Sequence, residues 1–377
     1  MVAAKSEKKS LQQIHDSTKR LLDDLRSLKH DINDELLTLR HQYLTKQIES
    51  IVAKVEMLKG NKLSFDEESK ALYDAVAPTY SEGYFKSILK ELDAKLPGSA
   101  SVQRRYETFK NQFIIPKDKL DVVFKAAIEE CRKRTKQHIV LPENECFVIE
   151  YVTYKAWSGY NWFKGKSHSL IQINTDLPIY VDRVVDLAAH EGYPGHHVYN
   201  ALLEQNLLKK KGWVEFSVYV LFSPQSLIAE GTANYGIEVV FTPEERTAFE
   251  RDVVFWLAGL EASKVELYYN IHALFMKLVC ADNEAARGYL NGVMTKEASI
   301  HWLMEYALMS KDRAIQRIKF FDNYRSYVVN YNLGQDMVKK YVEEIRGAGT
   351  SSAKRWAEFT KLISLPRLPS GLQEPPL

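Results

Sequence analysis

The stretch from Val181 to His197 reads VDRVVDLAAHEGYPGHH, and it decides the fold class. Its first part, Val181–Ala189, places apolar side chains at helical spacing, and the pattern stays helical from there nearly to the end of the chain. Pro194 and Gly195 interrupt this helix, because proline lacks an N–H donor and glycine adopts backbone angles that other residues avoid. The stretch therefore predicts two helices joined by a sharp break, within a mainly α protein.

Strand-like alternation occurs in only two segments, both before this stretch. They are CFVIEYV, at Cys146–Val152, and SLIQIN, at Ser169–Asn174. A glycine- and aromatic-rich segment, Ser158–Lys166, lies between them and is expected to form a turn. The pattern predicts a small β-hairpin or edge sheet beside the helix of the quoted stretch. As an edge strand, Ser169–Asn174 could pair with an extended peptide.

The N-terminal part of the chain is predicted to be helical. There is no glycine between Met1 and Lys59, and apolar residues recur there at alternating steps of three and four: Leu11, Ile14, Leu21, Leu25, Leu28 and Ile32. This heptad spacing predicts one long helix or a helical hairpin. A homodimer through these helices is the alternative to packing on the rest of the chain.

Capping patterns predict where further helices begin. Ser64 with Glu67 is a capping-box pattern, and Thr242 with Glu245 repeats it for a long segment that reaches Cys280. We expect the chain to divide into an N-terminal helical region (1–145), a region that contains the histidine-rich stretch quoted above (146–363) and a proline-rich C-terminal tail (364–377).

Composition excludes several classes of protein. The 377 residues include 51 Lys+Arg and 49 Asp+Glu, which gives a net charge of +2. This net charge is too small for a strong overall electrostatic attraction to nucleic acid or an anionic membrane. Three scattered cysteines are too few for a disulfide framework and indicate a reducing compartment. The first residues, MVAAKSEKKSLQQ, contain no apolar run of a secretory signal, and the longest apolar run, Val253–Leu260, is far too short to span a membrane. A soluble, cytoplasmic protein is expected.

The quoted stretch also carries the strongest chemical signal. Three of the ten histidines lie within HEGYPGHH, at His190, His196 and His197. The segment resembles the H-E-x-x-H zinc signature, in which two imidazoles bind the metal and the Glu, here Glu191, takes a proton from the bound water. In a regular helix, His190 and His196 would be about 9 Å apart along the axis, too far to share an ion. We therefore expect the break at Pro194 to return one of the pair to the metal.

His196 is expected to be that ligand, because an outward fold of two residues is the smallest break that restores the i, i+4 relation. His197 would then line the cleft or donate to a carboxylate. The alternative to a metal site is a helix–turn–helix corner with exposed histidines.

A zinc site of this kind needs a third protein ligand and an open position for water. Glu230, in AEGTANY (229–235), is the best candidate, because its carboxylate lies in an otherwise apolar or small-residue helical stretch. Asn234 lies four residues on, on the same helix face, and could orient a ligand. Glu238 is the rival to Glu230. One Zn²⁺ per chain is predicted.

These segments resemble those of a known family. HEGYPGHH followed by Val198–Tyr199 is similar to the H-E-x-x-P-G-H-H segment of the bacterial family called domain of unknown function 885, which is regarded as a family of zinc metallopeptidases. AEGTANY resembles its E-G-W-A-x-Y segment, with Thr232 in place of the usual Trp. The resemblance covers residues 146–341 and implies a multi-helical, thermolysin-like (gluzincin-type) fold. It implies that His190, Glu230 and one histidine of the 196–197 pair are ligands, and that Glu191 is the general base.

The sequence departs from the family in two respects, one in a late segment and one in length. The family's late R-Y-x-x-x-P-G-Q-A segment is only echoed by YNLGQ (331–335), with Leu333 in place of Pro, and this chain is shorter than the members of the family. Tyr327 or Tyr331 could donate a hydrogen bond to an oxyanion, but in a chain with 21 tyrosines a packed tyrosine is the simpler interpretation. Three arginines at helical spacing, Arg313, Arg317 and Arg325, could receive a substrate carboxylate, but a solvated basic face is the simpler interpretation.

The sequence therefore favours a zinc-dependent hydrolase, most simply a peptidase that acts on a peptide or another small amide. Two alternatives remain open. A set of two histidines and one carboxylate also suits non-haem iron and a different chemistry. The protein could also be a catalytically vestigial, metal-binding scaffold whose N-terminal helices engage a partner.

Overall fold

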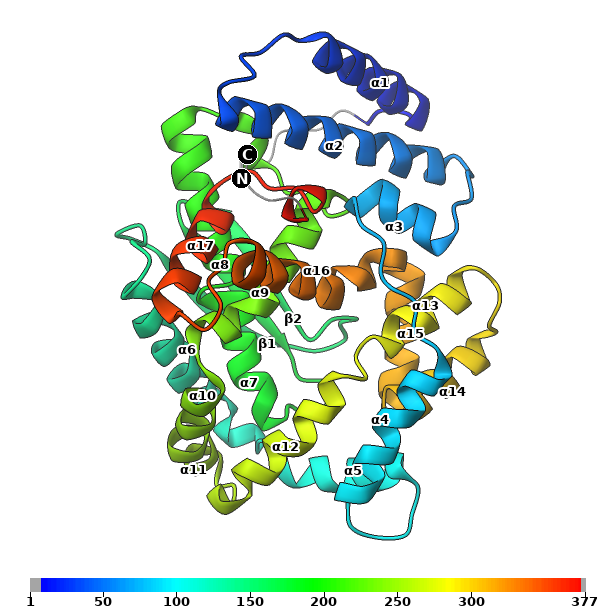
Figure 1. Ribbon diagram of the computed structural model, residues 1–377, viewed down its shortest axis with the longest axis vertical. Helices are drawn as coiled ribbons and strands as arrows, with labels where there is room; N and C mark the ends of the chain where they lie inside the picture. Colours follow the sequence, from blue (N-terminus) through cyan, green and yellow to red (C-terminus); the bar gives the residue numbers. More distant parts are fainter. Residues whose placement is uncertain (1–7, 374–377) are drawn as a thin grey trace.

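A computed structural model describes residues 8–373, and these are mainly helical, with 68% helix and 6% strand (Figure 1). The prediction of a mainly α protein with a small sheet is confirmed. The first seven residues of the charged N-terminus and residues 374–377 of the predicted tail lie outside the described part.

Seventeen α-helices form the described chain, several of them extended by short π or 3₁₀ turns. Their bounds are α1 Leu11–Ser27, α2 Glu35–Leu58, α3 Phe65–Tyr73, α4 Glu82–Lys95, α5 Val102–Lys110, α6 Leu120–Lys136, α7 Val181–Leu187, α8 His196–Leu203, α9 Pro224–Val240, α10 Pro243–Phe249, α11 Phe255–Ala258, α12 Val265–Met276, α13 Ala281–Leu290, α14 Lys296–Tyr306, α15 Lys311–Tyr324, α16 Val329–Lys340 and α17 Ser352–Ser364.

The N-terminal heptad region is a helical hairpin, one of the two forms predicted. Helices α1 and α2 lie side by side at one end of the molecule (Figure 1). Asp34 begins α2 by accepting a hydrogen bond from the Leu37 N–H. Within the heptad pattern, Leu21 and Leu28 remain 54% and 60% exposed, so the seam is only partly covered by α2. The homodimer through this region stays a prediction.

The sheet has three strands instead of the expected two. They are β1 (Cys146–Val152), β2 (Gly159–Gly165) and β3 (His168–Asn174), in the order β1-β3-β2. The segment predicted as a turn, Ser158–Lys166, is therefore largely strand β2, and it forms an antiparallel hairpin with β3. Strands β1 and β3 run parallel, with Cys146 opposite His168. Since β3 is central, the edge-strand role predicted for Ser169–Asn174 passes to β2, whose glycine and aromatic residues had concealed its strand character.

The predicted capping boxes at Ser64 and Thr242 are both present. The long helix expected from Thr242 to Cys280 is nevertheless broken. It ends as α11 at Gly259, which adopts a left-handed conformation with φ of 70°, and resumes as α12 at Val265. The helical spacing of apolar residues continues across this break, because α11 and α12 each bury one apolar face.

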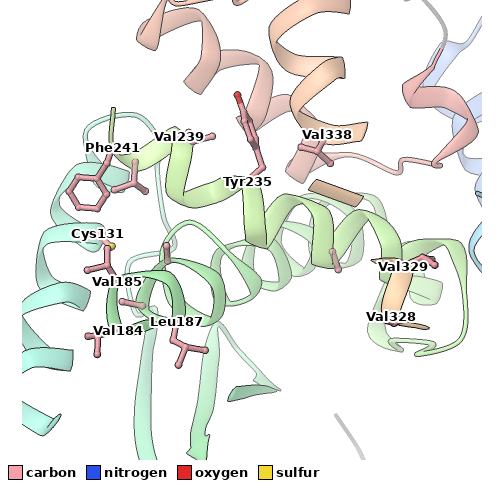
Figure 2. Close-up of a cluster of buried hydrophobic side chains, with 14 of the residues drawn as sticks. Cys131, Val184, Val185, Leu187, Tyr235, Val239, Phe241, Val328, Val329 and Val338 are labelled. Atoms are coloured by element: carbon pink, nitrogen blue, oxygen red, sulfur yellow. The ribbon is translucent and has the colours of Figure 1, made fainter. Parts of the chain in front are cut away.

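The core is one continuous cluster that includes residues from all three predicted regions of the chain, from Phe65 to Leu372. Figure 2 shows part of it, where side chains of α6, α7, α9 and α16 gather, among them Cys131, Val184, Val185, Leu187, Tyr235, Val239 and Val338. Among the described residues, no helix combines the length and apolar character needed to cross a membrane.

Helices α9 and α16 pack against each other with their backbones in close contact. A Cβ atom on Gly231 would lie 2.4 Å from the Gly334 carbonyl oxygen, and one on Gly334 would lie 2.8 Å from the Leu227 oxygen. Only glycine at both positions lets the two backbones approach this closely. The close approach brings the start of α16 and the turn before it, with Tyr327 and Tyr331, against the face of α9 that carries Glu230.

Candidate metal centre

The break predicted at Pro194 and Gly195 is present and folds the chain back on itself. Helix α7 continues as a π turn, Ala188–Gly192, which carries His190 and Glu191, and α8 restarts at His196. The Gly195 N–H donates to the Ala189 carbonyl oxygen at 2.9 Å. A Cβ atom on Gly195 would lie 1.9 Å from the His190 carbonyl oxygen, so no other residue fits this return.

The return brings three donor atoms together. His190 Nε2 lies 3.3 Å and His196 Nε2 lies 3.6 Å from Glu230 Oε2, and the donor atoms of the three residues all lie within 4.8 Å of one another. Ligands about 2.1 Å from a tetrahedral zinc ion stand about 3.4 Å apart. The spacing of the donor set therefore fits one metal ion, with nitrogen and oxygen ligands that zinc accepts.

Glu230 presents one oxygen to this set and uses the other to hold its position. Its Oε1 accepts a hydrogen bond from the Tyr327 hydroxyl at 2.8 Å. Its Oε2 is buried and has no hydrogen-bond partner of good geometry, although both imidazoles face it. Burial alone would raise the pKa of Glu230, but the charge of His196 and the contacts with both histidines lower it strongly. A buried carboxylate oxygen without a partner is costly, and a metal ion would satisfy it.

Asn234 orients His190 from one turn further along α9. Its amide Nδ2 donates to the Tyr331 carbonyl oxygen at 2.9 Å, so its Oδ1 faces the ring and accepts from His190 Nδ1 at 2.8 Å. This bond places the proton of a neutral imidazole on Nδ1 and leaves Nε2 free as a ligand. The orienting role expected for Asn234 thus has the matching geometry.

Glu191 lies beside the donor set without joining it. The residue is 4% exposed, and its Oε2 is buried with no hydrogen-bond partner. Burial raises the pKa of its carboxyl group, and the nearby charges of His190 and His196 partly offset this. The Asn161 side chain of β2 donates to the Glu191 backbone oxygen at 2.8 Å, which fixes the turn that carries it. Glu191 is therefore a buried, uncommitted base candidate next to the metal candidates.

His197, the other candidate ligand of the 196–197 pair, lies outside the donor set in the structure. Its Nδ1 contacts Ser169 Oγ at 2.9 Å and its Nε2 contacts Glu145 Oε2 at 3.1 Å, so both ring nitrogens are occupied. The reason is geometric: consecutive residues of α8 point in different directions, and His196 already faces Glu230. Of the two outcomes foreseen for the spare histidine, contact with a carboxylate is the one observed.

Glu145 is the centre of a cluster that no sequence pattern indicated. Besides His197, its carboxylate accepts hydrogen bonds from the Tyr193 hydroxyl and from the Arg132 guanidinium. Glu145 lies just before β1 and Arg132 lies in α6, so neither belongs to the histidine motif. The cluster ties the break in the histidine stretch to the sheet and to α6.

The remaining predicted residues divide between the site and other contacts. Tyr327 binds Glu230, and the Tyr331 side chain lines the same cavity as the donor set. Glu238, the rival ligand, instead pairs with Lys339 at 2.6 Å and accepts from Gln335 at 2.9 Å.

The site opens into a large cavity of about 1640 Å³. Edge strand β2 forms one wall through Gly159–Phe163 and Gly165, and Tyr324 and Tyr331 contribute from α15 and α16. The donor set and Glu191 therefore face a space that can admit a molecule much larger than water.

Comparison with known proteins shows the fold alone. No protein-family model and no curated protein matches the sequence. Among solved structures, a protein from Colwellia psychrerythraea that is provisionally described as a lipoprotein matches with a TM-score of 0.55 and 16% identity over 97% of this chain. A protein of unknown function from Shewanella oneidensis, provisionally described in the same way, matches with a TM-score of 0.53 and 13% identity over 96% of this chain.

The chain spans 66% of the Colwellia protein and 72% of the Shewanella protein. The cytoplasmic location predicted from the N-terminus and the cysteines is contradicted by these neighbours, both of which are described as lipoproteins, and it is withdrawn. The error has a physical source: composition and three cysteines describe the folded chain and say little about where a cell delivers it.

Proposed function

We propose that the protein is a zinc-dependent hydrolase, and most simply a peptidase. The observation that carries the proposal is the set formed by His190, His196 and Glu230, whose donor atoms have the spacing of metal ligands. Membership of the domain of unknown function 885 family and a thermolysin-like arrangement of the site belong to the same proposal. When bound, a zinc ion supplies a Lewis acid for a carbonyl oxygen and lowers the pKa of a water to about 7.

The protein's own residues supply the proton transfers. Glu191 has a buried, unpartnered Oε2 beside the donor set, so it accepts the proton of the attacking water and passes it to the leaving amine. Tyr331 faces the cavity and is our candidate donor to the oxyanion. Tyr327 already donates to Glu230, so we assign it to holding that carboxylate in place.

The shape of the cavity supports a peptide or another small amide as the substrate. Among the described residues no strand other than β3 pairs with β2, and residues 159–163 and 165 of β2 line the cavity. An extended peptide can add to such an edge through main-chain hydrogen bonds. This arrangement would lay the peptide across the donor set.

A metal-dependent enzyme of another chemistry is the second candidate. Two histidines and one carboxylate also form the ligand set of many non-haem iron enzymes. The donor set of this protein is of that kind, so the identity of the bound metal separates the two proposals.

The test is metal analysis of protein purified without chelators, coupled to digestion of a peptide library. We expect about one zinc per chain, loss of zinc and of hydrolysis after chelation, and recovery of both when zinc is returned. Iron as the tightly bound metal would support the second candidate. A protein that neither retains nor takes up zinc on titration would contradict the zinc proposal.

A further inference from the structure

Three cationic side chains share the cavity with the donor set. Lys110 ends α5, Arg183 lies in α7 and Arg313 lies in α15, and all three line the cavity. Each comes from a different part of the chain, so only the fold brings them together. The Lys110 ammonium lies 4.5 Å from the centre of the Tyr180 ring, which also lines the cavity.

These cations have few counter-ions. Arg313 makes one side-chain hydrogen bond, to Gln316 Oε1 at 3.2 Å. Within residues 8–373, no carboxylate oxygen lies within 4 Å of the charged nitrogens of Arg313 or Lys110. Arg183 reaches Asp186 only at 3.5 Å, and Asp186 also accepts from Arg246 at 2.9 Å.

Arg317 provides the contrast one turn along α15. It lines the same cavity, but its guanidinium lies 2.5 Å from Asp282 and is therefore paired. Asp182 also lines the cavity, and its carboxylate accepts a hydrogen bond from the Tyr268 hydroxyl at 2.5 Å. Burial raises the pKa of Asp182, but the charges of Lys110 and His272 lower it overall. Asp182 and Asp186 thus offset part of the charge of Lys110 and Arg183, whereas Arg313 has no carboxylate partner among the described residues.

The three cations also disfavour one another. Burial lowers the pKa of Arg313, and the charges of Arg183 and Arg317 lower it further. Burial likewise lowers the pKa of Lys110. The charge of Asp182 opposes this most strongly, and the charges of Arg183 and Arg313 add to the lowering. A buried charge without a partner is costly, so such an arrangement is typical of a site whose partner is a ligand.

The sequence favoured a solvent-exposed basic helix face for Arg313 and Arg317. In the structure, both residues line the cavity instead. Of the three arginines considered together, only Arg325 does not line the cavity; it pairs with Glu68 at 2.6 Å. The helical spacing was correct, but it could not reveal that part of this face looks into a cavity.

We propose that Arg313, Arg183 and Lys110 form a pocket for a carboxylate of the substrate. The inference rests on the proposed hydrolase and names its substrate class: peptides with a negative group near the scissile bond. A guanidinium pairs with a carboxylate by charge-assisted hydrogen bonds, and Arg313 and Arg183 can each offer two.

The distance to the donor set defines where that negative group lies. Arg183 and His190 are seven residues apart on a continuous helix, about 10 Å along its axis. An extended peptide advances about 3.3 Å per residue. The carboxylate is therefore expected two or three residues from the scissile bond, either as the C-terminal carboxylate or as an acidic side chain.

The experiment compares three N-acetylated hexapeptides of Ala, Leu and Phe. One has a free C-terminal carboxylate, one has a C-terminal amide, and one has the amide with Asp two residues from the end. Binding is measured by calorimetry on the zinc-loaded Glu191→Gln protein, which should not turn the peptides over. The same measurement is made with Arg313→Gln added, with Arg313→Lys added, and with Arg104→Gln added as the control. Arg104 is an exposed arginine of α5 that does not line the cavity, so its change alters net charge equally.

We expect at least one of the two charged peptides to bind roughly tenfold or more tightly than the neutral amide. Which of the two binds identifies the source of the carboxylate. The preference should disappear with Arg313→Gln, persist with Arg104→Gln and be partly kept with Arg313→Lys. Equal binding of all three peptides, binding of none, or a preference that survives Arg313→Gln in a folded protein would overturn the pocket.

A library digest of the wild-type protein keeps this inference separate from the proposed hydrolase. Hydrolysis that is indifferent to peptide charge would overturn the pocket and leave the hydrolase standing. A charge preference in binding that depends on Arg313, without any hydrolysis by the zinc-loaded wild type, would support the pocket and overturn the hydrolase.

Discussion

Two clusters of histidine and glutamate meet at the same backbone break, and they differ in how far their polar atoms have hydrogen-bond partners. His196 belongs to the donor set with His190 and Glu230, where a buried carboxylate oxygen lacks a hydrogen-bond partner. His197, the next residue, belongs to the Glu145 cluster, where both of its ring nitrogens have partners within the protein.

This difference in hydrogen bonding distinguishes a candidate binding site from a cluster that only supports the structure. A buried polar group costs free energy unless it is paired, and a protein can supply the pair itself or leave it to a ligand. The Glu145 cluster is complete, so we assign it to holding the break against the sheet. The donor set is incomplete, so we assign it to the metal. Changes in the two clusters should therefore have different consequences.

The largest expected effect is on turnover, from Glu191→Gln. The amide keeps the size of the side chain but cannot accept the proton of the water, so turnover should fall by about 10²–10⁴-fold while zinc is retained. Peptide hydrolysis and metal content of the purified variant are measured together. Glu129→Gln, at an exposed position of α6, is the control for the loss of one negative charge. Equal loss of zinc would mean that Glu191 is itself a ligand, and the proposed proton transfer would be wrong.

The next largest effects are expected from changing the two neighbouring histidines, one on zinc affinity and one on folding stability. His196→Ala removes a proposed ligand, so zinc affinity should fall by at least about 100-fold, with little change in the stability of the metal-free protein. His197→Ala leaves Glu145 with one partner fewer and opens a cavity, so it should lower the free energy of unfolding by about 2–4 kcal/mol.

Zinc titration and urea unfolding of both variants, each with zinc removed for the unfolding measurement, test this pair. The comparison of the two clusters fails if His197→Ala abolishes zinc binding in a folded protein while His196→Ala leaves it intact.

A smaller effect is expected at Asn234. Without its Oδ1, His190 loses the acceptor that fixes its ring and its tautomer, so Asn234→Ala should weaken zinc binding by about 10–100-fold. Asn234→Asp keeps an acceptor and should retain more of the affinity. Competition with a zinc chelator gives both values, and an unchanged affinity in Asn234→Ala would remove this residue from the site.

The smallest effect is the acid dependence of stability that Glu145 contributes. Burial raises the pKa of its carboxyl group, but hydrogen bonds with His197, Tyr193 and Arg132 outweigh burial and lower the pKa overall. A group whose pKa is lower in the folded state stabilises the protein above its unfolded pKa of about 4.3. This contribution is lost progressively as the pH falls below that value and through the lower pKa of the folded state.

Urea unfolding of the zinc-free protein between pH 7 and pH 3 measures this contribution. Glu145→Gln cannot titrate, so its stability should fall less steeply over the acid range than that of the wild type. A variant with the same acid slope as the wild type would show that Glu145 is not held by its partners in solution.

Several local features of the site could be predicted from the sequence. The apolar period of Val181–Ala189 specifies a helix face, and Pro194 and Gly195 specify a break, because each restricts or frees the backbone within its own turn. The isolated carboxylate of Glu230, with Asn234 one turn on, indicated the face of α9 that lies against His190 and His196 in the structure. These predictions depended on residues within a few positions of one another, where helical geometry is enough.

Other features depended on segments that meet only in the folded chain. The strand character of β2 was hidden, because its pairing with β3 sets its conformation more than its glycine-rich composition does. The partners of His197 lie up to 52 residues away in sequence, at Glu145 and Ser169, and no spacing rule connects them.

The sequence by itself determined the helical class, the break and the residue types able to hold a metal, because these follow from backbone geometry and side-chain chemistry within single segments. The tertiary structure alone decided which groups His197 contacts, at Glu145 and Ser169. It also decided that Arg313 looks into a cavity beside Arg183 and Lys110, and that Tyr327 reaches the carboxylate. These outcomes depend on the close approach of α9 and α16 and on the direction of each side chain after the break, which distant contacts set.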